Sequence, residues 1–149
     1  MVAVLVLTGC GSGHDKPKPA DWRAGADAAC FKARNLLAPL QPPSSFSSAE
    51  LVAGAVALAL RQELDRTAAL GPPPPAAARA AEQLRRARRA MLVVLVGEIR
   101  AARTRNLRRI QHAIRRLTRL GHVATTAAAA AGLRICGHEL DRGITELPA

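Results

Sequence analysis

The hydrophobic residues of this chain recur at steps of three and four residues over four long segments, which is the periodicity of amphipathic helices. The pattern is most regular between residues 107 and 131. Its apolar positions there are Leu107, Ile110, Ile114, Leu117, Gly121, Ala124, Ala128 and Ala131. Because one side of such a helix is apolar along its whole length, it must pack against neighbours. The second half of the segment is almost entirely alanine, so we expect neighbouring helices to approach closely there.

Capping and helix-breaking residues set the boundaries of these segments. Asp21 can cap the first helix, and Ser47 and Glu50 have the spacing of a capping box for the second. The four prolines 72–75 separate the second helix from the third, and Gly132 ends the fourth. The predicted helices are 21–38, 47–71, 76–103 and 107–131.

The composition also indicates an all-helical domain. Ala, Leu and Arg, all strong helix formers, make up 70 of the 149 residues. The β-branched and aromatic residues that suit a pleated surface are scarce, which excludes a β-sandwich or β-barrel. The length suits one small domain. Four amphipathic helices joined by short connections therefore predict an all-α, up-and-down four-helix bundle over residues 21–137.

The first ten residues form an apolar run that ends in Leu7-Thr8-Gly9-Cys10. This run resembles a bacterial lipobox, in which an aliphatic residue and two small residues precede a cysteine that receives a diacylglycerol. The resemblance implies a signal peptide over residues 1–9, cleavage before Cys10, and acyl chains on Cys10 that anchor the protein to the outer side of the cell membrane. The Gly-, Pro- and Lys-rich residues 10–20 are expected to be a flexible lipidated tether. The apolar stretch is short and carries no Lys or Arg, so we expect the start codon to lie upstream of Met1.

Two further cysteines, Cys30 and Cys136, enclose almost the whole predicted bundle. In an exported protein an even pair predicts one disulfide. For a loop of ~100 residues, the chain-entropy model gives a stabilisation of about 4 to 5 kcal/mol. Two unpaired thiols in a cytosolic protein are the alternative. A metal site is not expected, because Cys136-Gly137-His138 together with Cys30 matches no usual zinc spacing.

The order of these features is similar to that of a group of small actinobacterial lipoproteins of unknown function. The shared marks are the lipobox, Cys30 in the first helix, the proline-rich break and the closing Gly132-Leu133-Arg134-Ile135-Cys136-Gly137. The resemblance covers Cys10 to about Gly137, and residues 138–149 follow as a tail. It implies a fold and an envelope location but no activity.

The chain lacks the usual enzymatic motifs. It has no Gly-rich phosphate loop, no Cys-x-x-Cys-His haem motif and no Glu-x-x-His pair, so we expect no catalytic residues, no cofactor and no metal. The histidines are expected to be solvated side chains; they are His14, His112, His122 and His138. Glu98 lies among apolar residues, and we expect it to form a salt bridge with a nearby arginine such as Arg103 or Arg105, with partial burial as the alternative. The apolar run 91–96 is expected to be buried on more than one side, with a partner-binding patch as the alternative.

Charge is the one feature that points to a function. The chain carries 22 Lys and Arg against 11 Asp and Glu, a net charge of +11. Residues 79–119 hold 13 arginines and two glutamates, and so account for the whole excess. Paired arginines are expected to cover the outer face of one helical hairpin; they are Arg85, Arg86, Arg88, Arg89, Arg108, Arg109, Arg115 and Arg116. A genome of high GC content encodes proteins rich in Ala, Arg and Pro, and this composition explains the same pattern without any function.

Two functions fit this charge. The first is a monomeric, membrane-anchored binding or scaffolding module whose basic hairpin meets anionic lipids, cell-wall polymers or an acidic protein. The second is a cytosolic nucleic-acid binder in which the same arginines contact phosphates. The second requires the lipobox and the cysteine pair to be coincidences. Only three residues are aromatic and none of them is tyrosine, so a base-stacking surface is not expected.

Overall fold

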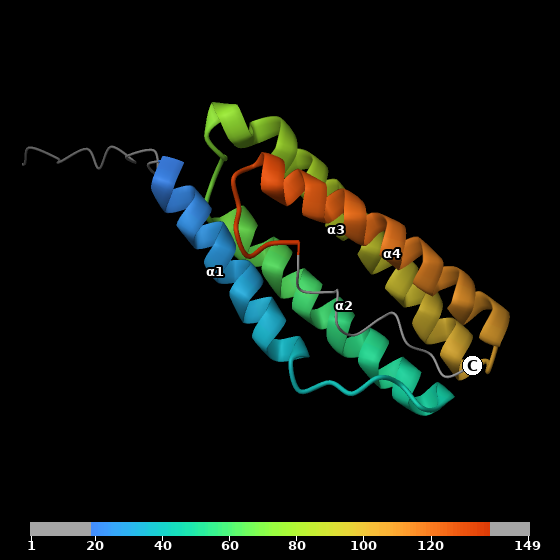
Figure 1. Ribbon diagram of the computed structural model, residues 1–149. Coiled ribbons are helices and arrows are strands. Elements are labelled where there is room, and N and C mark those ends of the chain that lie inside the picture. Colours follow the sequence, from blue (N-terminus) through green and yellow to red (C-terminus); the bar gives the residue numbers. More distant parts are fainter. Residues whose placement is uncertain (1–18, 138–149) are drawn as a thin grey trace, which may run out of the picture.

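The computed structural model describes residues 19–137 of the chain, and these residues form four helices without a strand. The helices are α1 (Pro19–Leu37), α2 (Phe46–Ala69), α3 (Pro75–Arg103) and α4 (Leu107–Ala130), shown in Figure 1. Each predicted helix is present, and most of its boundaries differ from the prediction by one or two residues. The all-α, four-helix prediction is confirmed.

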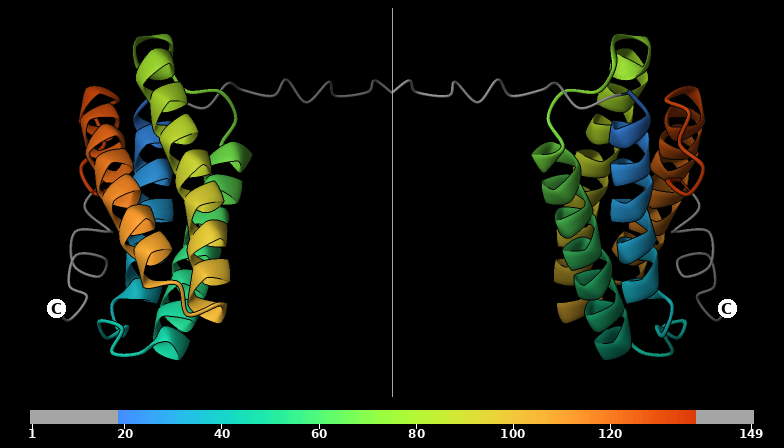
Figure 2. Two further views of the ribbon diagram at one scale, coloured as in Figure 1. Left: turned by 90° about the vertical axis from the view of Figure 1, so that its right-hand side faces the viewer. Right: turned by 90° about the vertical axis from the view of Figure 1, so that its left-hand side faces the viewer.

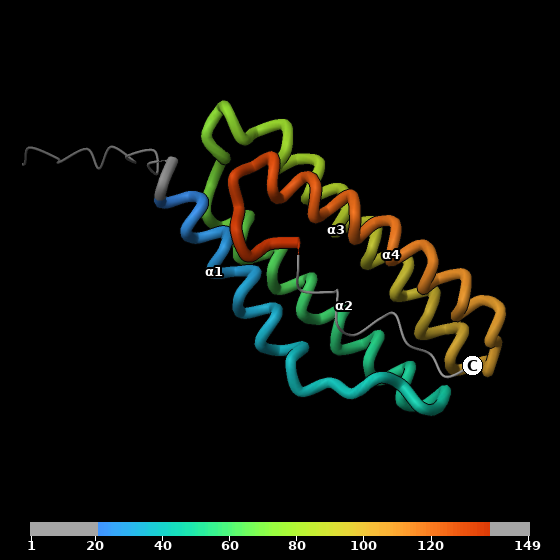
Figure 3. Tube along the Cα trace, in the orientation of Figure 1, coloured from blue at the N-terminus to red at the C-terminus, as the bar shows by residue number. Residues whose placement is uncertain are grey.

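Consecutive helices run in opposite directions and pack against one another. The helix pairs in contact are α1 with α2, α2 with α3, and α3 with α4 (Figures 1 and 2). The first helix therefore has backbone-level contact with only one other helix, and its second attachment comes from the segment after α4. Figure 3 shows this segment, in red, returning from the end of α4 towards α1.

The returning segment is bound to α1 by a disulfide and by a carboxylate. Cys30 and Cys136 are bonded, with their Cα atoms 5.2 Å apart. The Asp27 carboxylate accepts hydrogen bonds from the backbone N–H groups of Arg134, at 3.0 Å, and Ile135, at 2.9 Å. These contacts satisfy backbone donors that follow the end of α4. The predicted pairing of the two cysteines is confirmed.

Two predicted helix caps were wrong. The second helix is capped by Ser45, whose Oγ accepts the Ser48 N–H at 3.1 Å, while the Ser48 Oγ accepts the Ser45 N–H at 2.8 Å. Two serines thus form the capping box, and Glu50 is engaged elsewhere: its Oε1 accepts a hydrogen bond from Arg103 Nε at 2.7 Å. Asp21 lies inside α1, because that helix already begins at Pro19. Proline is favoured at the first helical position.

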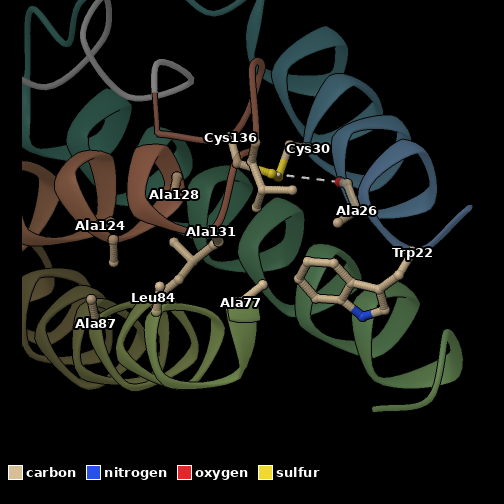
Figure 4. Packing of buried hydrophobic residues seen from close by; sticks show 13 residues of the cluster. Trp22, Ala26, Cys30, Ala77, Leu84, Ala87, Ala124, Ala128, Ala131 and Cys136 are labelled. Carbon is tan, nitrogen blue, oxygen red and sulfur yellow. Dashed lines mark hydrogen bonds between the residues drawn. A yellow bond between two sulfur atoms is a disulfide. The ribbon is translucent and has the colours of Figure 1, made fainter. Parts of the chain in front are cut away.

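The core changes in character along the bundle. Near the disulfide it is built from alanines of α3 and α4 that face one another, such as Ala87 and Ala124, and it is closed by Trp22 of α1 (Figure 4). Further from the disulfide the buried side chains are larger, among them Leu60, Met91 and Leu117. The alanine-rich half of α4 lies against the neighbouring helix as expected. Within residues 19–137, no helix is both long enough and apolar enough to cross a membrane.

The apolar run 91–96 is only partly buried. Met91, Val94 and Leu95 are in the core, whereas Val93 is 71% exposed and Val96 is 44% exposed. The prediction of burial on more than one side thus holds for half of the run. Leu92 is partly buried against the core, so Val93 and Val96 are the residues of the run that bring apolar surface to the outside of α3.

Candidate anion-binding groove

The structure separates the eight arginines that were expected to share one outer face. Arg88 is buried, and the prediction for it was wrong. Its Nε donates to Glu63 Oε1 of α2 at 3.0 Å, and its side chain is 1% exposed. Residue 88 lies four residues after Leu84 and three before Met91, both of which are buried. It therefore falls on the inner face of α3.

The other seven arginines are exposed, but they differ in their partners. Arg85 and Arg86 both pair with the Glu82 carboxylate, one turn away on α3. Arg89 and Arg115 form no ion pair with another described residue and lie outside the groove defined below. The three that remain, Arg108, Arg109 and Arg116, converge on one site.

That site is a groove of about 470 Å³ between α3 and α4, here called the basic groove. Its floor is apolar and consists of Val93, Val94, Gly97 and Ala113. Its rim is basic and consists of Arg100, Arg108, Arg109, His112 and Arg116. The groove opens to solvent, so a ligand can reach both floor and rim without a change in the fold.

The turn between the two helices explains why these residues meet. Arg105 adopts a left-handed conformation with φ of 51°, and Asn106 caps α4 by accepting the Arg109 N–H at 3.1 Å. The chain thereby reverses within three residues. Positions at similar distances from such a turn face one another, so Arg100 of α3 lies opposite Arg108 and Arg109 of α4. An antiparallel helical hairpin brings together residues that are far apart on a single helix.

The electrostatics of the basic groove are one-sided. No Asp or Glu lines it, and its four arginines form no ion pair within residues 19–137. The four arginines give the groove four positive charges. Like charges in close proximity raise the free energy of the unoccupied site, so an anion that enters relieves this repulsion as well as forming its own contacts.

Two members of the groove were not predicted from the sequence. Arg100 is an isolated arginine and not part of a pair, and His112 was expected to be a solvated side chain. The sequence signal for both is the turn at 104–106, because a chain that reverses there places residues before the turn opposite residues after it. The pairing of arginines along the sequence was a weaker guide, because it ignores the direction of each side chain.

A second cavity lies between α1, α2 and α3, with a volume of about 460 Å³. Its charged side chains come from oppositely charged pairs, Glu63 with Arg88 and Glu82 with Arg85. The charges of its lining residues therefore sum to zero, and the cavity does not favour a ligand of either sign. The basic groove, whose charges all have one sign, is the stronger candidate site.

The surroundings of Glu98 also differ from the predicted salt bridge. No salt bridge joins it to Arg103 or Arg105 within the described residues: Arg103 pairs with Glu50, and Arg105 lies beyond the end of α3. Glu98 is on the inner face of that helix, and its Oε2 is buried without a hydrogen-bond partner among residues 19–137. Burial raises the pKa of the Glu98 carboxyl from 4.5 to about 7.

This shift makes the stability of the fold depend on pH. The folded protein holds a proton on Glu98 that the unfolded chain releases, so stability from this group is greatest below pH 4.5 and falls as pH rises to about 7. Between pH 5 and pH 8 we expect a loss of about 2 to 3 kcal/mol in the free energy of unfolding. Glu98→Gln should remove this loss. Urea unfolding of both proteins at the two pH values measures it, and equal losses would contradict the prediction.

Several predicted features lie outside the described residues. They are the signal peptide 1–9, the lipidation site Cys10, most of the tether 10–20 and the tail 138–149. The histidines His14 and His138 lie there too. The domain boundaries proposed for these segments stay predictions.

The basic groove has a recognisable chemical preference. Guanidinium groups form paired hydrogen bonds with phosphate and carboxylate oxygens, and several of them around one site favour a multiply charged anion. The apolar floor adds contact area that a small inorganic anion does not use. Comparison of this chain with models of protein families, with curated proteins and with solved structures finds no match.

Proposed function

We propose that this protein is a bacterial envelope lipoprotein, anchored through an acylated Cys10, whose basic groove binds anionic molecules of the envelope. One observation carries the proposal: Arg100, Arg108, Arg109 and Arg116 surround a single open groove that no carboxylate lines. Lipid headgroups and wall polymers are the abundant anions of that location, and both present phosphate or carboxylate oxygens. The protein is a binding module in this proposal and not an enzyme.

The disulfide supports the proposed location. Structural disulfides persist in exported proteins and are rare in the cytosol, where thiols are kept reduced. The Cys30–Cys136 bond therefore favours an envelope protein over a cytosolic nucleic-acid binder that would use the same arginines. The lipobox Leu7-Thr8-Gly9-Cys10 supplies the anchor in this proposal.

The groove arginines are expected to dominate binding to anionic surfaces. The variant has four substitutions, Arg100→Gln, Arg108→Gln, Arg109→Gln and Arg116→Gln, which keep helix propensity and remove four charges. Each arginine near an anionic membrane contributes about 1 kcal/mol, so the variant should bind phosphatidylglycerol vesicles at least ~100-fold more weakly. Sedimentation of unacylated protein with these vesicles and with phosphatidylcholine vesicles measures the effect.

A matched variant separates the groove from net charge. It removes four exposed arginines outside the basic groove, through Arg79→Gln, Arg89→Gln, Arg115→Gln and Arg119→Gln. Because its net charge equals that of the groove variant, it should lose clearly less affinity. Equal losses of vesicle affinity in both variants would show that binding depends on overall charge. No loss of affinity in either would show that the arginines have no binding role and reflect the composition of the genome.

The anchor has its own test. From a start codon that restores a complete signal peptide, Cys10→Ala should move the protein from the membrane fraction to the soluble fraction. Two or more acyl chains give stable anchoring, whereas the protein domain alone depends on salt-sensitive contacts. Fractionation at high salt is the measurement. Membrane association of the variant that resists high salt would contradict the lipoprotein assignment.

A further inference from the structure

The basic groove does not end at its arginines. A second groove, of about 580 Å³, lies between the same two helices on the side away from the turn. Ala90 of α3 lies one turn from Val93 of the basic groove, and Leu120 of α4 lies one turn from Arg116. Because the two lining sets follow one another on both helices, the two grooves lie end to end on one face of the α3–α4 hairpin, and together they are here called the long groove.

The two ends of the long groove differ in polarity. The end nearer the turn carries the four arginines without ion-pair partners. The other end is lined mainly by apolar and small side chains, including Ala87, Ala90, Leu120, Val123 and Ala127. Its one arginine, Arg86, is already paired with Glu82, at 2.9 Å. A cationic end therefore continues into an apolar end.

Apolar side chains stand exposed along the long groove. Val93 is 71% exposed and Val123 is 52% exposed, one on each helix. Small residues leave open space in the floor of the groove: a Cβ placed on Gly97 would meet no atom within 4 Å. From residue 83 to residue 93 the helix rises by ten steps, about 15 Å, close to the length of a chain of about a dozen carbon atoms.

We propose that the long groove binds one anionic amphiphile, a single-chain phosphate ester such as a lipid phosphate, with its phosphate among the arginines and its hydrocarbon chain along Val93 and Val123. Four guanidinium groups match a doubly charged phosphate monoester better than a singly charged carboxylate. The chain covers the exposed valines and gains from leaving water. The inference rests on the proposed function and narrows its ligand from any envelope anion to this class.

A chain-length series tests the inference on the full chain with Cys10→Ala, which carries no lipid of its own. The probes are inorganic phosphate, butyl phosphate, octyl phosphate and decyl phosphate, each below its micellar concentration, measured by equilibrium dialysis. A CH₂ group that is about half buried should raise affinity about twofold. The expected result is one bound molecule per protein, affinity that rises steadily with chain length, and no binding of decyltrimethylammonium.

Two serine variants locate the hydrocarbon chain. Val93→Ser with Val123→Ser should flatten the dependence on chain length. Val123→Ser alone should flatten it in part and leave affinity for inorganic phosphate unchanged, because Val123 lies outside the basic groove. The control is Leu51→Ser with Leu58→Ser on α2, whose side chains are 73% and 56% exposed, much like the two valines. It should keep the wild-type dependence on chain length.

A steric variant tests the long groove without loss of apolar surface. Gly97→Leu projects a side chain into the open space of the basic groove and should block all four phosphates. Gly54→Leu is the control, because a Cβ on that helical glycine also meets nothing within 4 Å, and Gly54 belongs to α2. Both variants replace glycine inside a helix and should not destabilise the fold. Circular dichroism confirms that each is folded.

The possible failures point to different conclusions. If the serine variants and the wild type respond equally to chain length, the amphiphile inference is overturned. The proposed function then still stands, provided that the four-arginine groove variant loses phosphate binding. If that variant binds inorganic phosphate as well as wild type does, both proposals fail. Binding of an acidic helical peptide without any response to alkyl phosphates would identify a protein partner instead and would also overturn the inference.

Discussion

Replacement of both Cys30 and Cys136 by serine is expected to lower the free energy of unfolding by about 4 to 5 kcal/mol, and the melting temperature by about 10 to 20 °C. The disulfide joins residues 106 positions apart, so its loss frees almost the whole domain in the unfolded state. Small domains have a total stability of about 5 to 15 kcal/mol. The variant should therefore fold only marginally, with its helical content retained at low temperature.

The structure adds a local reason for a large effect. The backbone of the first helix lies close to α2 alone among the helices, and the segment 131–137 holds it from the other side. Its contact with α3 and α4 is through side chains of the core cluster, such as Trp22 and Ala26. Without the disulfide, the segment is still held to α1 by the Asp27 carboxylate, by a hydrogen bond from Arg23 Nε to the Ala131 carbonyl at 3.2 Å, and by side-chain packing. We expect α1 to separate from the bundle before α3 and α4 unfold.

The chain provides a convenient probe of this separation. Trp22 is the only tryptophan, the chain has no tyrosine, and the indole is buried in the same cluster as the disulfide (Figure 4). In the serine variant its fluorescence should change at lower urea than the circular dichroism of the helices does. In the oxidised wild type the two signals should change together. Reduced wild type should behave as the variant does; a stability loss below 1 kcal/mol in both would contradict the expectation.

Helix positions were predictable because they depend on local signals. The steps of three and four residues, the prolines at 72–75 and Gly132 all act within one or two turns of the chain. The capping error at Ser47 has the same local origin: two pairs of serines flank Phe46 and offer more than one possible cap, and the path of the preceding loop selects Ser45. Such errors move a boundary by one or two residues and leave the fold unchanged.

The errors that concern charge have a different cause. Arg88, Glu98 and Arg100 are all charged residues of one helix, yet the first two point inward and the third lies on the rim of a groove. The face of the helix on which each side chain lies follows from the helical period, so the sequence alone distinguishes the inward Arg88 from the outward Arg89. The groove also requires the register between α3 and α4, which depends on the geometry of the turn 104–106. A list of paired arginines contains neither kind of information.

The buried ion pair between Glu63 and Arg88 yields the second large effect. Arg88→Met should lower the free energy of unfolding by about 3 to 5 kcal/mol, because the Glu63 carboxylate stays in the core without this guanidinium. Glu63→Leu should cost a similar amount through the buried arginine. Both side chains are almost fully buried, at 1% and 3% exposure, so water cannot replace the missing partner. Urea unfolding at constant pH measures both.

The double variant Glu63→Leu with Arg88→Met decides what the pair does. Replacement of a buried ion pair by apolar side chains of similar size is often neutral or stabilising, since the cost of removing two charges from water then disappears. We expect the double variant to recover most of the stability that each single variant loses. Stability in the double variant as low as the sum of the two single losses would show that the two residues act independently, and the buried pair would then not account for the position of Arg88. With recovery, Arg88 belongs to the core of the fold, and only the exposed arginines of the hairpin are left to carry the proposed anion binding.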